Sequence, residues 1–169
     1  MGDGIEARRA RPSDLDTVVS ILEEAARWLA TRGIRQWEPG SFSRRDVERR
    51  IERDEAFVFR VSGRVVGCVV LQWSDEEVWG KRPDDAGYVH GLAIRRAEAG
   101  KGLGTELLRW AEGCVGASGR KYLRLDCASS NRALNEYYER AGFRSRGRVL
   151  AWGLEVSRYE KKVGAFGGG

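Results

Sequence analysis

The chain has 169 residues, 41% of them hydrophobic and 33% charged, which is typical of one folded domain and excludes a disordered chain. No apolar run approaches the ~20 residues of a membrane span, and the N-terminus lacks the pattern of a signal peptide, so we expect a cytoplasmic protein without a membrane partner. The net charge of +5 comes from 30 basic residues interleaved with 25 acidic ones, which favours a mixed solvated surface over a nucleic-acid-binding one.

Hydrophobic periodicity and turn residues predict an α+β protein of about seven strands and four helices. The N-terminal half should hold a strand at 5–10, a helix from Ser13 to near Gly33, a charged helix at 43–52, and a hairpin of strands at 56–61 and 64–73. A polar loop at 74–85 leads to a strand at 88–94. The C-terminal half should hold a helix from about 103 to 116–119, a strand at 121–127, a short helix ended by Gly142, and strand-like runs around Trp152 and Tyr159.

The run Gly100-Lys101-Gly102-Leu103-Gly104 lies between the strand at 88–94 and the following helix. Three alternating glycines do not form a stable helix interior, so they indicate a loop that presents backbone N–H groups to an anion at a helix start. The Walker loop does not fit, because Lys101 is followed by Gly102 instead of Ser or Thr. The dinucleotide fingerprint does not fit either, because its third glycine would stand where Thr105 stands.

The cysteines and the single histidine offer no metal-binding pattern. Cys68, Cys114 and Cys127 are too widely spaced for a zinc motif, and their odd number gives no disulfide framework. His90 is the only histidine, and no Gly-x-Ser-x-Gly nucleophile elbow is present. We therefore expect no metal and no serine-hydrolase chemistry.

The strand at 88–94, the loop at 99–104, the strand at 122–127 and the run Tyr137-Tyr138-Glu139-Arg140-Ala141-Gly142-Phe143 together resemble the GNAT family of N-acetyltransferases. The resemblance covers the acetyl-CoA-binding core, at about 88–143. The run Trp28-Leu29…Gly33…Gln36-Trp37 is similar to the front end of small bacterial members. The resemblance implies a mixed, mostly antiparallel sheet whose central strands splay apart to hold acetyl-CoA.

The family's loop pattern is Gln/Arg-x-x-Gly-x-Gly/Ala, and Ala99 stands at its first position when Gly102 and Gly104 are aligned with its last two. The resemblance assigns the loop to the pyrophosphate of coenzyme A and the end of the preceding strand to its pantetheine arm. Asn131 matches a cofactor-contacting asparagine, although a plain helix cap is the alternative. The implied cofactor-binding residues are Leu92, Ala93, Ile94, Gly100, Lys101, Gly102, Leu103, Gly104, Thr105 and Asn131.

Two residues are candidates for proton transfer. Tyr138 matches the family's tyrosine that protonates the leaving sulfur, and a phenol of pKa about 10 is protonated at neutral pH. Its alternative role is packing on the apolar face of its helix. His90 is the candidate base, because an imidazole has a pKa of about 6.5 and strand alternation places it on one face with Tyr88 and Leu92. A packed histidine, with a water chain as the base, is the alternative.

We expect Trp28, Gln36 and Trp37 to contact the acceptor, although these residues can equally belong to the core. The predicted activity is acetyl transfer from acetyl-CoA to a primary amine of a small molecule, such as an amino acid derivative or an amine-bearing antibiotic, by direct attack in a ternary complex. The alternatives are a non-catalytic acyl-CoA-binding or regulatory domain, a protein or peptide N-acetyltransferase, and a nucleic-acid-binding module. We expect one domain at 1–163, a loose tail at 164–169, and a monomer or homodimer.

Overall fold

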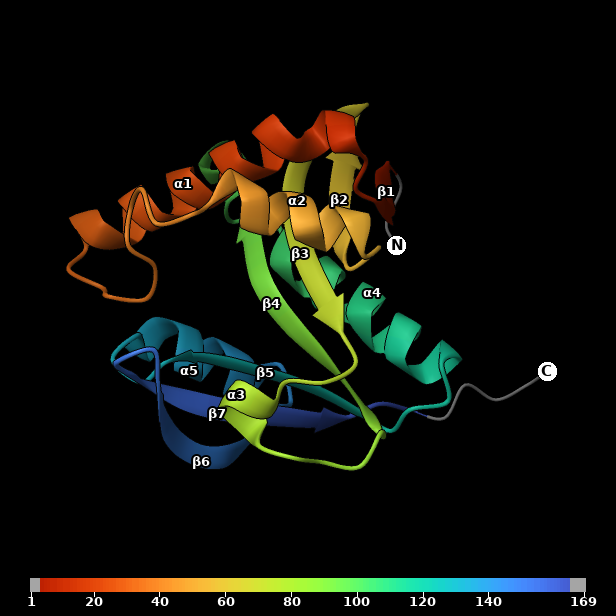
Figure 1. Cartoon of the computed structure of the whole chain (residues 1–169), viewed down its shortest axis with the longest axis vertical. Helices are drawn as coiled ribbons and strands as arrows, with labels where there is room; N and C mark the ends of the chain where they lie inside the picture. The colour runs from red at the N-terminus through yellow and green to blue at the C-terminus, as the bar shows by residue number, and fades with distance from the viewer. Residues whose placement is uncertain (1–3, 165–169) are drawn as a thin grey trace. The chain divides into compact units, whose positions relative to one another are not determined.

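The computed structural model describes residues 4–164, which form an α+β fold with one seven-stranded sheet (Figure 1). The predicted loose tail lies, apart from Gly164, outside the described residues. In chain order the elements are β1 (Ile5–Arg9), η1 (Pro12–Asp14), α1 (Leu15–Thr31), α2 (Arg44–Glu52), β2 (Ala56–Val61), β3 (Arg64–Gln72), α3 (Glu76–Trp79), β4 (Ala86–Ile94), η2 (Arg96–Glu98), α4 (Leu103–Ala117), β5 (Tyr122–Ala128), α5 (Arg132–Arg140), β6 (Arg144–Ala151) and β7 (Leu154–Lys162).

The strand order is β1-β2-β3-β4-β5-β7-β6. Strand β4 pairs with β5 in parallel, from Ala86 opposite Tyr122 to Tyr88 opposite Arg124. The pairs β1–β2, β2–β3, β5–β7 and β6–β7 are antiparallel. The sheet is therefore mixed and mostly antiparallel, as expected.

Two compact units divide the chain, and the first contains residues 4–71 and 91–110. Its core joins α1 and α2 to the strands beside them (Figure 1). The apolar side chains of α1 recur at helical spacing, so Val18, Ile21 and Leu22 are all buried on one face. In α2 the predicted inward residues Val47 and Ile51 are buried, while the rest of this charged helix stays at the surface.

The second unit contains residues 72–90 and 111–164. One cluster of buried residues joins α3, β4, β6 and β7, and it includes Trp79, Tyr88 and Val156. A second group joins α5 to β7, because the ring of Tyr138 lies 5.7 Å from that of Phe143 and 5.9 Å from that of Tyr159. The start of β4, with β5, β7 and β6, thus forms the sheet of this unit.

Three local details refine the predicted boundaries. The segment 74–85, expected as a loop, contains the short helix α3, which Asp75 caps by accepting a hydrogen bond from the Val78 N–H. Helix α1 begins at Leu15 instead of Ser13, because Asp14 accepts from the Arg11 N–H at 2.7 Å and closes a short 3-10 turn before it. Helix α4 ends at Ala117, within the predicted range.

None of the helices within residues 4–164 is long and apolar enough to cross a membrane.

Candidate active site

The glycine loop connects η2 to α4 in the first unit. Gly100 and Gly102 both have φ +78°, a left-handed conformation that favours glycine. No heavy atom lies within 4 Å of the position that a Cβ would take at either glycine. At the start of helix α4 the Glu106 N–H donates to the Gly102 carbonyl oxygen at 3.2 Å, and the first turn of a helix points its backbone N–H groups outward along the axis. This open, backbone-lined helix start fits a pyrophosphate.

Side-chain contacts hold the segment that leads into this loop. Glu24 of α1 accepts hydrogen bonds of 2.7 Å from Arg95 Nη1 and from the Arg96 N–H. Burial opposes ionisation of Glu24, but these donors outweigh it and hold its pKa below the ordinary value. Lys101 pairs with Glu98 at 2.8 Å. Because Arg95 and Lys101 already have carboxylate partners, we expect the backbone to be the main element that would bind an anion here.

Near the end of β4, strand β3 approaches closely at Gly67. A Cβ on Gly67 of β3 would lie 2.8 Å from Ile94 Cδ1 and 3.1 Å from the Ala93 carbonyl oxygen, so a larger residue there would displace the end of the Ile94 side chain and press on the β4 backbone. Gly91 has φ +57°, which interrupts the regular alternation of the strand. Simple alternation along the strand therefore does not place Leu92 on the same face as His90.

The three predicted acceptor residues lie in the first unit in different surroundings. Trp28 is half-buried, and two guanidinium groups lie over its ring, Arg96 at 3.8 Å and Arg32 at 4.8 Å from the centroid. Trp37 packs against the core of this unit and meets the Phe42 ring edge-on at 5.6 Å. Gln36 is half-buried. Trp28 is thus linked to the segment that precedes the glycine loop, and Trp37 is part of the core packing.

Tyr138, the predicted acid, is a buried residue of α5 in the second unit, with 5% of its surface exposed. Among the described residues its hydroxyl makes no hydrogen bond, whereas the hydroxyl of Tyr159 donates to Asn135 and Glu139. Burial raises the pKa of Tyr138, and the neighbouring Cys127, Tyr137 and Asp126 raise it further. The phenol is therefore protonated at neutral pH and has a proton to donate.

His90 lies beside two carboxylates that the sequence analysis did not select. Among residues 4–164, Asp75, His90 and Asp126 each place one ligand atom within 4.8 Å of the other two. Asp75 Oδ2 is buried, makes no hydrogen bond in the described structure and lies 3.5 Å from His90 Nε2. This cluster can take up a proton or bind a cation. Its spacing would also suit a divalent metal ion, so the absence of a metal stays a prediction.

Asp126 is the residue of this cluster whose carboxylate pKa is clearly shifted. Burial raises its pKa, and the nearby charge of Asp75 raises it further, to about 7. Cys127, the next residue on β5, is buried, and burial followed by the charge of Asp126 raises the pKa of its thiol to about 12. At neutral pH the carboxylate can thus exchange a proton, while the thiol stays protonated and is a poor nucleophile.

Asn131 is the N-cap of α5, and its side-chain oxygen accepts a hydrogen bond from the Leu134 N–H at 3.3 Å. It is buried, with 4% of its surface exposed. Asn135 also donates to its carbonyl oxygen at 2.8 Å. The structural role that the sequence allowed for Asn131 is therefore present, and its contact with the cofactor stays a prediction.

Comparison with known proteins gives a consistent family. The model of the acetyltransferase (GNAT) family matches residues 21–143. YesJ of Bacillus subtilis, named an uncharacterized N-acetyltransferase, is 32% identical over 156 residues, or 87% of this chain and 86% of that protein. The S-(2-succino)cysteine N-acetyltransferase of the same organism is 31% identical over 120 residues, or 69% of this chain and 70% of that protein. A crystal structure of a GNAT acetyltransferase from Listeria monocytogenes has a TM-score of 0.79 at 28% identity and covers 94% of both chains. The chain therefore belongs to the GNAT family, which uses acetyl-CoA, and it is an N-acetyltransferase.

Proposed function

We propose that the protein transfers the acetyl group of acetyl-CoA to a primary amine of a small molecule by direct attack in a ternary complex, in the cytoplasm. The observation that carries this proposal is the cluster of Asp75, His90 and Asp126, whose ligand atoms lie within 4.8 Å of one another. An amine is mostly an ammonium ion at neutral pH and must lose a proton before it attacks. Two carboxylates and an imidazole attract the cation and can accept that proton.

Most of the predicted site residues have a role in this reaction. The backbone of residues 100–105 binds the pyrophosphate, and the N–H groups at the end of β4 polarise the thioester carbonyl. His90, with its carboxylate neighbours, takes a proton from the ammonium. The nitrogen attacks the carbonyl carbon, the C–N bond forms and the C–S bond breaks. Tyr138 protonates the departing thiolate and regains a proton as the amide nitrogen loses its second one. The products are the acetylated amine and the thiol of coenzyme A, and one proton is released to solvent overall.

A small-molecule acceptor has support from a relative. The Bacillus subtilis protein that matches 69% of this chain is named for N-acetylation of S-(2-succino)cysteine. We extend to this chain only the class of acceptor, a small amine, and not that compound. Trp28 and Gln36 are the first-unit residues we assign to the acceptor, while the packing of Trp37 indicates a structural role as well.

Thiol release measured with a panel of small primary amines tests the proposal. We expect turnover with at least one amine and a rise in melting temperature with acetyl-CoA, because a ligand that binds the native state stabilises it. Stabilisation by acetyl-CoA without turnover on small amines, combined with turnover on peptide N-termini or lysine peptides, would contradict the small-molecule assignment. No stabilisation by acetyl-CoA would contradict the cofactor site.

A further inference from the structure

The cluster of Asp75, His90 and Asp126 draws its ligand atoms from three segments of the second unit. Asp75 comes directly before α3, His90 belongs to β4 and Asp126 belongs to β5. One ligand atom of each residue lies within 4.8 Å of those of the other two. These residues are far apart along the chain, so the sequence shows no metal-binding spacing at this place.

Asp75 is fixed with one carboxylate oxygen close to the imidazole. Its Oδ1 accepts a hydrogen bond from the Val78 N–H at 3.3 Å, which caps α3. Its Oδ2 lies 3.5 Å from His90 Nε2, and this buried oxygen accepts no hydrogen bond among the described residues. The Asp75 side chain is only 8% exposed, whereas that of His90 is 24% exposed. A buried acceptor without a donor is costly, so a cation that enters beside the imidazole would stabilise the cluster.

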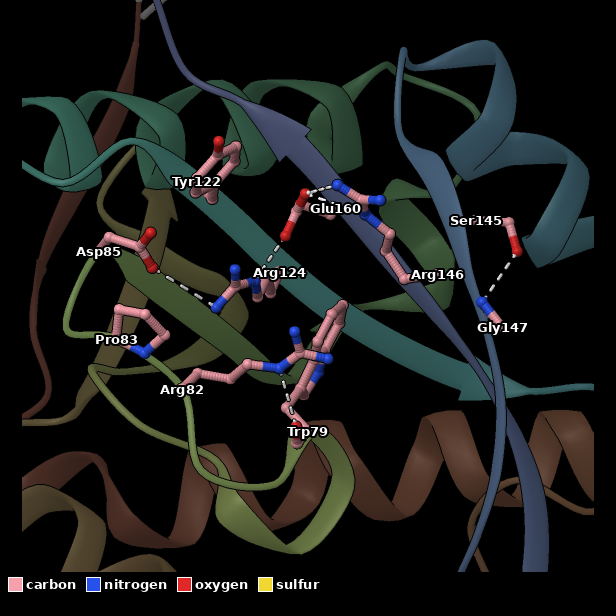
Figure 2. A pocket seen from close by; sticks show the side chains of 10 residues that line it. All are labelled: Trp79, Arg82, Pro83, Asp85, Tyr122, Arg124, Ser145, Arg146, Gly147 and Glu160. Atoms are coloured by element: carbon pink, nitrogen blue, oxygen red, sulfur yellow. Dashed lines mark hydrogen bonds and ion pairs between the residues drawn. The ribbon is translucent and has the colours of Figure 1, made fainter.

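Other carboxylates of the second unit have arginine partners. A cavity of about 610 Å³ in this unit shows the difference, and none of the three cluster residues lines it (Figure 2). Its charged and aromatic lining includes Trp79, Arg82, Asp85, Arg124, Arg146 and Glu160. Glu160 accepts hydrogen bonds from Arg124 and Arg146, and Asp85 lies 3.7 Å from Arg124 Nη1. The negative charges at this cavity are therefore met by guanidinium groups of the chain.

The carboxylates of the cluster have no such neutralisation. Within residues 4–164, no lysine or arginine forms an ion pair with Asp75 or Asp126. A neutral imidazole adds no positive charge, so the cluster can hold up to two negative charges. Like charges at this separation repel each other, and a cation bound between them removes the repulsion.

The types of ligand atom select the class of cation. Imidazole nitrogen suits Zn²⁺ and its neighbours in the first transition row, whereas Mg²⁺ and Ca²⁺ prefer sets of oxygen ligands. Zinc binds nitrogen and oxygen at about 2.1 Å, so two ligand atoms of one tetrahedral ion lie about 3.4 Å apart. The distance of 3.5 Å between Asp75 Oδ2 and His90 Nε2 matches this value. The limit of 4.8 Å for the whole set leaves a contraction of at most about 1.4 Å on binding.

We propose that Asp75, His90 and Asp126 bind one divalent transition-metal ion of the Zn²⁺ class, and that this ion inhibits the enzyme. The binding site stands by itself, while the inhibition rests on the proposed function. In that function, the cluster attracts the acceptor ammonium and takes a proton from it. A bound metal ion occupies the same lone pairs and repels the ammonium. Acetyl transfer therefore belongs to the metal-free protein, in keeping with the expectation that the reaction uses no metal.

Zn²⁺ and Co²⁺ binding to the full chain, produced without a histidine tag and freed of metal by a chelator, tests the site. Calorimetry should show one Zn²⁺ ion per chain. His90 is the only histidine, so its ring signals in NMR spectra are identified without mutation and should shift when Zn²⁺ is added. Unchanged ring signals would overturn the site. An intense thiolate-to-Co²⁺ absorption band would also overturn it, because the ion would then be bound by a cysteine.

Asp75→Asn is the sharpest variant, because an asparagine oxygen can still cap α3 while the negative charge is removed. Asp75→Asn and His90→Gln should each weaken Zn²⁺ binding by about tenfold or more, since loss of a residue that only orients a ligand already costs roughly 10–100-fold. Asp84→Asn is the control, because the Asp84 side chain is 75% exposed and pairs with Arg120. It should bind Zn²⁺ as the wild type does. The same affinity in all three variants would overturn the site.

The acetylated product, followed by mass spectrometry because Zn²⁺ also binds free thiols, tests the inhibition. Saturating Zn²⁺ should lower kcat/KM for an amine acceptor at least tenfold, and EDTA should restore it. Turnover in a protein that binds no Zn²⁺ would overturn the inference and leave the proposed function intact. Zn²⁺ binding at His90 without acetylation of any amine would support the metal site and contradict the proposed function instead. Zn²⁺ binding at His90 with unchanged kcat/KM would overturn the inhibitory role.

Discussion

The glycine loop of the first unit and the acidic cluster of the second unit differ in what they are made of. The loop at 100–104 presents backbone N–H groups, and two basic side chains beside it, Lys101 and Arg95, are each paired with a carboxylate. The cluster consists of the side chains of Asp75, His90 and Asp126, which come from three separate segments. A backbone site depends on conformation, and a side-chain site depends on residue identity.

This difference explains how each region responds to sequence change. Ala99 stands where the family pattern has Gln or Arg, and alanine still supplies a backbone N–H group. No comparable replacement exists for Asp126 or His90, because no backbone group can accept a proton at neutral pH. We therefore expect the function of the loop to be lost when a substitution changes its backbone conformation. In the second unit, we expect a substitution that keeps the shape of a side chain but removes its ionisable group to be enough.

Tyr138→Phe should have the largest effect, because it removes the acid and nothing else. We expect kcat to fall by about 10²-fold or more, within the range of general acid catalysis. Its hydroxyl has no hydrogen bond among the described residues, so stability and the affinity for acetyl-CoA should change little. Steady-state kinetics and calorimetry measure both. Tyr137→Phe is the matched control on the same helix, and equal losses in the two variants would contradict the assignment.

Asp126→Asn tests whether this carboxylate takes up a proton near neutral pH. The measurement is the free energy of unfolding at two pH values. The pKa of Asp126 is raised from 3.8 to about 7 in the folded protein, so protonation of this carboxylate stabilises the folded state relative to the unfolded one. That stabilisation is complete below pH about 4 and is lost as the pH rises through about 7. Relative to the wild type, the variant should gain roughly 2–4 kcal/mol between pH 4 and pH 8, by urea unfolding.

The control for this pH dependence is Asp84→Asn, because the Asp84 side chain is 75% exposed. It should change stability by nearly the same amount at both pH values. If Asp126→Asn also behaved in this way, its carboxylate would not be a proton acceptor near neutral pH.

Gly102→Ala should have the smallest effect. It tests whether the affinity for acetyl-CoA depends on the backbone conformation of the loop. A left-handed φ costs a residue with a Cβ about 1–2 kcal/mol, so the loop should relax and the affinity for acetyl-CoA should fall about tenfold. Gly119→Ala is a close control, since Gly119 also has φ +78° and no atom within 4 Å of its Cβ position. It should lower the melting temperature without changing affinity. Equal affinity losses in both variants would show that the loop has no special role.

Features that are local along the chain were predictable. The glycine spacing at 100–104, the inward Val47 and Ile51 of α2, and the helix that ends at Gly142 each depend on residues within one or two turns. The class of fold followed from the order of such elements. The four-residue helix α3 was missed, because a helix this short has almost no hydrophobic periodicity and depends on the Asp75 cap.

The candidate site divides in the same way. The sequence by itself determined the strand, glycine loop and helix that we assign to the cofactor, together with Tyr138 and His90 as proton-transfer candidates, because these positions belong to contiguous motifs. Only the tertiary structure decided that Asp75 and Asp126 stand beside His90, and that Arg82 and Trp79 line one cavity. The physical reason is that a perturbed pKa or an unmatched charge arises from burial and from neighbours distant in sequence, and no local pattern of residues encodes either.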